Sequence, residues 1–247
     1  RDLSELARES GRELSIGYPH TYSPHAIRAR EVMRSGELGA VQYVNCIMVS
    51  RVVEFLRGEG SPQFGSPIFP VHGPGAVYSQ PALSGGGQGH LQMTHMVGLL
   101  FFVAGLRARQ VVGMMRNHGL AVDLVDAMAV EFEGGALGSV GGSGNAFQHK
   151  LDLQLHCERG AIDMDMVAGT TTIRHADGTV EELPPVPDEE RARQRFMTSG
   201  NLVDMVLGRA GNGAPAEVGW RAVELLDAAY RSAGAGGAAV TIESLYE

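Results

Sequence analysis

Residues 126–140 read DAMAVEFEGGALGSV, and this stretch decides the fold class. Its apolar residues Met128, Val130 and Phe132 alternate with residues that are small or charged. A period of two is typical of a β-strand with one buried face, and the pair Gly134-Gly135 suits a tight hairpin turn. The stretch therefore predicts a β-hairpin with one apolar side.

The same period extends outward from this hairpin, over the range from Val111 to Leu183. Apolar and polar residues alternate over 151–157 and again over 162–166, and Asp177-Gly178 indicates a further turn. These segments predict an antiparallel meander with one apolar face. The opposite face is mixed rather than fully polar, so it is suited to cover a ligand or a second copy of the chain.

Helix and strand patterns precede the meander. Asp2 and Glu5 have the spacing of a capping box, in which two side chains satisfy the free backbone N–H groups at a helix start. Ser23-Pro24 indicates a second helix start, because proline fits the first helical position. The expected elements are a helix from Asp2 to Ser10, a strand from Leu14 to Tyr18, a helix from Pro24 to Gly36 and a strand from Val41 to Val53.

Helical patterns return after the meander, where the prolines between positions 184 and 187 interrupt the sheet. We expect one helix over 188–208, broken at Gly200, and another over 216–232. The tail at 238–245 is suited to a last strand. Helices and a meander in this order predict an α+β domain with an open sheet.

A stretch rich in glycine and proline lies between Arg57 and Gly89. Segments of this length inside a compact domain are commonly binding loops or lids, or else disordered. The aromatic and aliphatic side chains in it offer contact surface, so we expect a binding loop. These side chains are Phe64, Ile68, Phe69 and Tyr78.

Composition excludes several classes of protein. The 247 residues carry 20 basic and 28 acidic side chains, a net charge of −8, which argues against a strongly basic nucleic-acid-binding protein. The most apolar run, Met96 to Leu106, is far shorter than the ~20 residues of a membrane-spanning helix. Two cysteines, Cys46 and Cys157, form no disulfide framework, so we expect a reducing, cytoplasmic setting.

Several common chemical motifs are absent from the sequence. It contains no G-x-G-x-x-G dinucleotide fingerprint, no phosphate-binding P-loop and no H-E-x-x-H zinc motif. Nine histidines are present, but His90 and His95 are five residues apart, a spacing that points them to different sides of a helix. We therefore expect no metal site.

His95 is the best single candidate for a functional side chain. It shares a helical face with Leu91, Leu99 and Phe102, and this favours a hydrogen-bonded histidine of the core. The preceding run Ser84–Gly87 favours a site instead, because glycines let a ligand approach the backbone at a helix N-terminus. A neutral imidazole there can act as a general acid or base near neutral pH. Both interpretations stay open on spacing alone.

Several motifs occur in one order along nearly the whole chain. GYPHTYSP at 17–24 is followed by MRSGELG at 33–39, and GGG at 85–87 opens the helical segment of His95. FEGGALG at 132–138 and AAYRSA at 228–233 complete the set. Together these motifs resemble the glucose-fructose oxidoreductase/inositol dehydrogenase (Gfo/Idh/MocA) family.

The resemblance implies an N-terminal Rossmann domain and a C-terminal domain of the dihydrodipicolinate-reductase type. The second domain would be α+β, with an open, mainly antiparallel sheet and helices packed on one face. Residues 1–23 would then be the last helix and strand of the Rossmann domain, and residues 24–247 the substrate-binding and oligomerisation domain. The glycine-rich fingerprint and the catalytic lysine of an E-K-P segment would precede Arg1.

The resemblance also implies an NAD(P)-dependent oxidoreductase that transfers hydride between the nicotinamide and a sugar, inositol or similar polyol. It implies a homo-oligomer that pairs through the sheet face. Leu91 stands where the family has an acid, so the contacts to substrate hydroxyls must differ. The implied site residues are His95 for catalysis, His90, Gly86 and Gly87 for substrate, and Tyr18, His20 and Tyr22 for the cofactor NAD or NADP.

A second interpretation is a ligand-binding or assembly module without catalysis. A chain that begins at Arg1 has no cofactor fingerprint, and its single lysine, Lys150, falls within a strand pattern. We therefore expect the 247-residue segment alone to be inactive. A Rossmann domain upstream would favour the enzyme.

Overall fold

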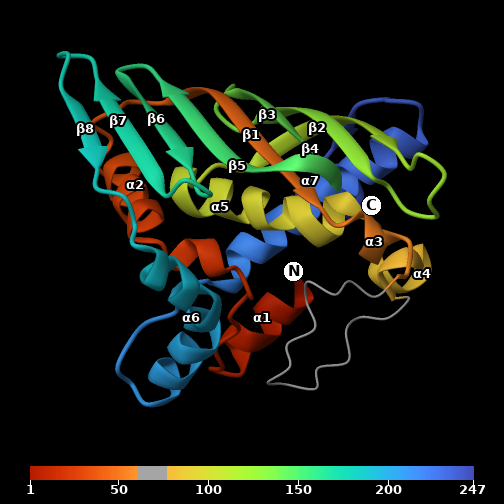
Figure 1. Cartoon of the computed structure of the whole chain (residues 1–247), viewed down its shortest axis with the longest axis horizontal. Helices are drawn as coiled ribbons and strands as arrows, with labels where there is room; N and C mark the ends of the chain where they lie inside the picture. Colours follow the sequence, from red (N-terminus) through yellow and green to blue (C-terminus); the bar gives the residue numbers. More distant parts are fainter. Residues whose placement is uncertain (60–76) are drawn as a thin grey trace.

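The computed structural model describes residues 1–59 and 77–247, and a single open sheet organises them. Helices cover one face of this sheet, and the other face is bare (Figure 1). The strands are β1 (Val41–Arg51), β2 (Ala108–Arg116), β3 (Val125–Phe132), β4 (Leu137–Ser143), β5 (Asn145–Cys157), β6 (Gly160–Asp165), β7 (Thr170–His175), β8 (Val180–Leu183) and β9 (Val240–Thr241). Their order in the sheet is β8-β7-β6-β5-β1-β4-β3-β2-β9.

The helices form two layers below the sheet (Figure 1). α2, α5 and α7 lie along the sheet, whereas α1 and α6 lie farther from it. The α-helices are α1 (Asp2–Glu9), α2 (Pro24–Ser35), α3 (Val53–Leu56), α4 (Pro81–Ser84), α5 (Thr94–Ala104), α6 (Asp188–Val206) and α7 (Ala216–Gly234). Shorter turns are the 3-10 helices η1 (Pro19–Tyr22), η3 (Val77–Ser79) and η5 (Glu243–Leu245), and the single π-helical turn η4 (Gly89–Met93).

The hairpin expected from residues 126–140 is present as β3 and β4. The Phe132 N–H donates to the Ala136 carbonyl, and Gly134 and Gly135 take the positive φ angles that the turn requires. Met128, Val130 and Phe132 are buried on the helix side of the sheet. This confirms the expected α+β fold with an open, mainly antiparallel sheet.

The sheet departs from a plain meander at β1. This strand pairs antiparallel with β5 on one side and parallel with β4 on the other. It therefore separates the expected meander into two groups of strands, β2–β4 and β5–β8. Its residues Val44, Cys46 and Met48 are buried against the helices, so the strand lies over the centre of the core.

The core is built around α5. Eight of its residues, Met96 to Val103, are buried because the helix lies between the sheet and the other helices. The described end of the glycine- and proline-rich segment places Tyr78 edge-on against Phe55, in a second and smaller hydrophobic cluster. Phe64, Ile68 and Phe69 lie outside the described residues.

The expected N-terminal capping box and strand are wrong. α1 begins after Arg1 without a side-chain cap, and Glu5 instead pairs with the Arg1 guanidinium at 2.8 Å. The apolar run at 14–18 makes only an isolated bridge, from Ser15 to Pro215. Apolar character alone does not create a strand when no adjacent strand is available to pair with it.

The expected break at Gly200 is also wrong, because α6 continues through it. A glycine inside a helix costs only ~1 kcal/mol relative to alanine, which the surrounding helix tolerates. The C-terminal strand is shorter than expected: β9 has two residues and η5 follows it. Among residues 1–59 and 77–247, no helix combines the length and apolar character needed to cross a membrane.

Candidate functional site

The helical segment that carries His95 begins with one π-helical turn, η4, and continues as α5. Such turns are rare and occur frequently at functional sites. Gly86 to Gly89 are buried just ahead of this segment, and Gly85 has a φ of 78°. The positive φ is readily adopted by glycine, and it redirects the chain from α4 into η4.

His95 lies near the start of α5, where two other rings meet it. Its ring centroid is 5.7 Å from that of Tyr18 and 6.3 Å from that of His20. Its Nδ1 is buried and has no hydrogen-bond partner in the described part of the chain. Burial disfavours the charged imidazolium and lowers the pKa of His95. A core histidine would be hydrogen-bonded, so this geometry favours the site interpretation over the core one.

Tyr18 and His20 are held beside His95 by the segment that leads into α2. The Tyr18 hydroxyl shares a 2.6 Å hydrogen bond with Oγ1 of Thr94. A Cβ on Gly98 would lie 2.5 Å from the Tyr18 ring, so this glycine allows the close approach. Burial, followed by the nearby His95 and His149 imidazoles, lowers the pKa of His20 to about 4.

Tyr22 has a different environment from the residues predicted to share its role. Its hydroxyl donates to Oδ1 of Asn201 on α6 at 3.1 Å. Its ring also packs closely on Gly213, where a Cβ atom would lie 2.4 Å from the Tyr22 ring. The structure thus joins Tyr22 to α6 and brings Tyr18, His20 and His95 together.

The predicted substrate residues contact α7 and the loop before β3. The His90 ring stacks on Tyr230 with a centroid distance of 4.7 Å and an angle of 6°. A Cβ on Gly86 would lie 2.1 Å from the Tyr230 hydroxyl oxygen, and one on Gly87 would lie 2.1 Å from the Asp123 carbonyl oxygen. These glycines are therefore required by packing, and neither they nor His90 make a described contact with His95.

Leu91 packs into a second hydrophobic cluster. This cluster comprises Val52, Val53, Phe55, Leu56, Val122 and Leu124, and Leu91 and Tyr78 lie against it. The side chain that stands at the family's acidic position is therefore part of an apolar wall.

A polar network that was not predicted from the sequence lies next to these glycines. The Asp123 carboxylate accepts hydrogen bonds from the Gly87 N–H at 2.7 Å, the Gly89 N–H at 2.8 Å and the Tyr230 hydroxyl at 2.6 Å. Burial and the neighbouring Asp123 raise the pKa of Asp126 to about 9. The available signal was two aspartates in the otherwise apolar run AVDLVDAMAV at 121–130, ahead of a buried strand.

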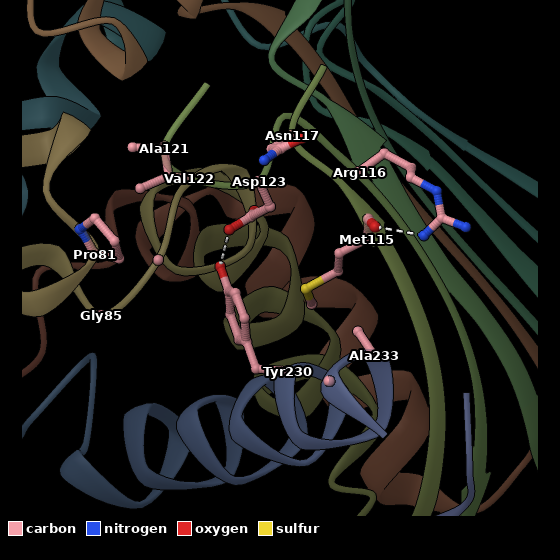
Figure 2. Close-up of a pocket in the computed structure, with 12 residues that line it drawn as sticks. Pro81, Gly85, Met115, Arg116, Asn117, Ala121, Val122, Asp123, Tyr230 and Ala233 are labelled. Carbon is pink, nitrogen blue, oxygen red and sulfur yellow. Dashed lines mark hydrogen bonds between the residues drawn. The ribbon is translucent and has the colours of Figure 1, made fainter. Parts of the chain in front are cut away.

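A cavity of about 430 Å³ opens beside this network (Figure 2). Asp123 and Tyr230 face one another at its wall, whereas the Arg116 guanidinium points away and donates to the Met115 carbonyl. The lining residues are Pro81, Gly85, Gly86, Met115, Arg116, Asn117, Ala121, Val122, Asp123, Tyr230, Ala233 and Gly234. Within the described ranges, no group of three histidine, cysteine, aspartate or glutamate side chains could hold a metal ion.

Comparison with known families decides where this fold belongs. The family model described as the GFO/IDH/MocA C-terminal domain matches residues 26–163, more than half of the chain. The chain belongs to the GFO/IDH/MocA family. This is a family of NAD-binding oxidoreductases, and the observed sheet with helices on one face is its C-terminal domain.

Solved structures share the GFO/IDH/MocA fold over almost the whole chain. An oxidoreductase domain protein from Kribbella flavida has a TM-score of 0.76 at 16% identity, covering 97% of this chain and 68% of its own. GenD2 from gentamicin A biosynthesis, in complex with NAD, has a TM-score of 0.72 at 23% identity, covering 98% and 67%. Aldose-aldose oxidoreductase from Caulobacter crescentus, complexed with glycerol, has a TM-score of 0.68 at 18% identity, covering 96% and 66%.

At identities this low the similarity establishes the fold alone. No curated protein matches this chain. The GFO/IDH/MocA family implies a nicotinamide cofactor, and the residues around His95 fit one part of it. The Nδ1 of His95, which lacks a hydrogen bond to any described residue and lies beside the rings of Tyr18 and His20, fits the reacting end of a nicotinamide and a hydroxyl substrate. The pyrophosphate-binding glycine motif is not among the 247 residues.

Proposed function

We propose that this GFO/IDH/MocA chain is the substrate-binding part of an NAD(P)-dependent oxidoreductase. The reaction transfers hydride between the nicotinamide and a CH–OH carbon of a sugar, inositol or similar polyol. The observation that carries the proposal is the buried Nδ1 of His95 beside Tyr18 and His20, which has no hydrogen-bond partner among the described residues. The substrate class is supported by the Caulobacter crescentus neighbour, whose name states an aldose-aldose activity.

His95, together with the lysine that the family resemblance places upstream, manages the hydroxyl proton. Its lowered pKa keeps the imidazole neutral at physiological pH, so a ring nitrogen is free to accept the proton as the alcohol is oxidised. The bound cofactor supplies the hydride acceptor. Tyr18 restrains the start of α5 through Thr94, and the rings of Tyr18 and His20 flank the imidazole.

The remaining parts of the proposal concern the whole protein. Residues 1–23 belong to a nucleotide-binding domain, and residues 24–247 form the substrate-binding and oligomerisation domain. The partner is a second copy of the chain, which pairs through the bare sheet face, and the enzyme acts in the cytoplasm. Neither a membrane nor a nucleic acid is a partner.

The position of Lys150 favours a second candidate, a ligand-binding or assembly module. Its ammonium group pairs with Asp152 at 2.5 Å and its side chain is partly exposed, so this chain supplies no buried lysine beside His95. Calorimetry with NAD(H) distinguishes the two candidates. The 247-residue segment should not bind the cofactor, whereas the full-length protein should bind it if the enzyme proposal is correct.

Substitution of His95 by glutamine tests the proposed function. In the full-length protein, we expect His95→Gln to lower turnover of a sugar or polyol by roughly 10²–10⁴-fold, the usual contribution of general acid–base catalysis. The melting temperature should change little, because Nδ1 has no hydrogen bond to lose within the part of the chain that the structure describes. Nicotinamide absorbance over a panel of sugars and polyols measures the rate.

His175→Gln at the end of β7 is the matched control, and it should retain the wild-type rate. Early melting of His95→Gln with normal turnover per folded molecule would show that His95 is a core residue.

A further inference from the structure

Asp123, in the loop before β3, accepts hydrogen bonds from the backbone at the start of η4. Three consecutive backbone N–H groups donate to it: Gly87 to Oδ1 at 2.7 Å, Gln88 to the carbonyl oxygen at 3.0 Å and Gly89 to Oδ2 at 2.8 Å. The first N–H groups of a helical segment have no partner within that segment, and a negative charge there also interacts favourably with the helix dipole. Asp123 therefore caps η4 and, through it, α5.

Tyr230 on α7 also holds the Asp123 carboxylate, and the two side chains face one another in Figure 2. Its hydroxyl donates to Oδ1 of Asp123 at 2.6 Å and accepts from the His90 N–H at 3.3 Å. A Cβ on Gly89 would lie 2.7 Å from the same hydroxyl oxygen. The start of η4, the loop before β3 and α7 are thus closely packed against one another at this turn.

The neighbouring Asp126 is a second buried acid at this turn. Its carboxyl group is buried beside Asp123 on β3, and burial raises its pKa to about 9. Two adjacent buried carboxylates would repel each other, so Asp126 stays neutral. Asp123 is the member of the pair that accepts hydrogen bonds, from the Gly87 and Gly89 N–H groups and from the Tyr230 hydroxyl.

His95 needs this support because, within residues 1–59 and 77–247, its Nδ1 has no hydrogen-bond partner. Its position therefore depends on the backbone of the segment that carries it and on the flanking rings of Tyr18 and His20. That segment is restrained at its first turn by Asp123 and near His95 by the bond between Thr94 and Tyr18. We propose that Asp123, held by Tyr230, is a positioning residue that orients His95 for the reaction, an inference that rests on the proposed function.

The experiment compares Asp123→Asn and Tyr230→Phe in the full-length protein. An amide side chain keeps the shape of Asp123 but has one acceptor oxygen, so we expect hydrogen exchange at Gly87 and Gly89 to quicken at least ~10-fold. His95 should titrate at a changed pH in NMR spectra of its ring. With a sugar or polyol substrate, kcat should fall by ~10-fold or more while KM changes less.

Tyr230→Phe keeps the ring stacked on His90 and loses only the hydroxyl, so it should show the same changes at smaller size. Asp163→Asn, which removes an exposed carboxylate paired with Arg174 on the sheet, is the control and should change none of the three measurements.

Folded variants with unchanged exchange and unchanged His95 titration would overturn the proposal. So would faster exchange with kcat and His95 unaffected, since the network would then be structural only. If Asp123→Asn does not fold, Tyr230→Phe decides the question by the same measurements. If exchange and titration respond but the wild type oxidises no sugar or polyol, the proposed function fails while the positioning of His95 stands.

Discussion

At the scale of single residues, Asp126 connects the stability of the protein to pH. Its pKa is raised from 3.8 to about 9 in the folded state, so the folded protein binds this proton more tightly than the unfolded chain does. The stability it contributes is fully present below pH 3.8 and is lost as the pH rises toward about 9. Asparagine does not ionise, so Asp126→Asn should remove this loss of stability at higher pH.

Urea denaturation at about pH 5 and about pH 8 checks the prediction for Asp126, and Asp163→Asn serves as control. We expect the free energy of unfolding of Asp126→Asn to exceed that of the wild type more strongly at the higher pH. An equal difference at both pH values would show that Asp126 does not hold a proton there.

Leu91 yields a second prediction at this scale. Because its side chain lies against the second hydrophobic cluster, Leu91→Asp should place a carboxylate in apolar surroundings and lower stability by about 1–3 kcal/mol. Thermal or chemical unfolding measures the change. The exposed Leu83→Asp should have little effect, and a stable Leu91→Asp variant with improved polyol oxidation would contradict the apolar assignment.

At the scale of elements, α6 contains a glycine that neither its backbone conformation nor its packing requires. Gly200 lies inside the helix, is exposed and would have open space around a Cβ. Gly200→Ala should therefore raise the free energy of unfolding by roughly 0.5–1 kcal/mol. Gly208→Ala is the matched contrast, because its φ of 68° disfavours a side chain, and it should destabilise the protein. Chemical denaturation of both variants provides the test.

The elements also show what the sequence could predict. The β3–β4 hairpin was predictable because alternation and the glycine turn are local, and so was α2, bounded by Ser23-Pro24 and Gly36. The parallel pairing of β1 with β4 was not predictable, because it joins residues more than ninety positions apart that no local pattern relates.

The candidate site was predictable to a similar extent. Spacing alone left His95 between core and site, and the family resemblance favoured the site. Tyr18 and His20 do lie beside His95, whereas His90, Gly86 and Gly87 pack toward Tyr230 and Asp123. Asp123 was missed because its partners are three backbone N–H groups more than thirty residues earlier, and backbone donors leave no mark in the sequence.

At the scale of the whole molecule, the bare sheet face predicts self-association. Exposed apolar side chains on this face include Val112 and Met114 of β2 and Leu137 of β4. Pairing two sheets would bury them, so we expect a dimer or larger homo-oligomer in light scattering. Met114→Glu should weaken the association, whereas Val206→Glu on α6, distant from the sheet, should not. A monomer at high concentration would contradict the prediction.

The central position of β1 has a consequence for how the chain folds. Both neighbours of this strand are synthesised about a hundred residues after it, as the pairings of Tyr43 with Leu137 and Cys46 with Leu153 show. The strand groups β2–β4 and β5–β8 can each pair locally, because short turns join their strands. The two groups form one sheet only after β1 has paired between β4 and β5. High contact order of this kind slows folding. During synthesis β1 therefore leaves the ribosome before either neighbouring strand exists, and the backbone N–H and C=O groups on both of its edges stay unpaired. We expect it to be the segment of this sheet most prone to aggregation before folding is complete.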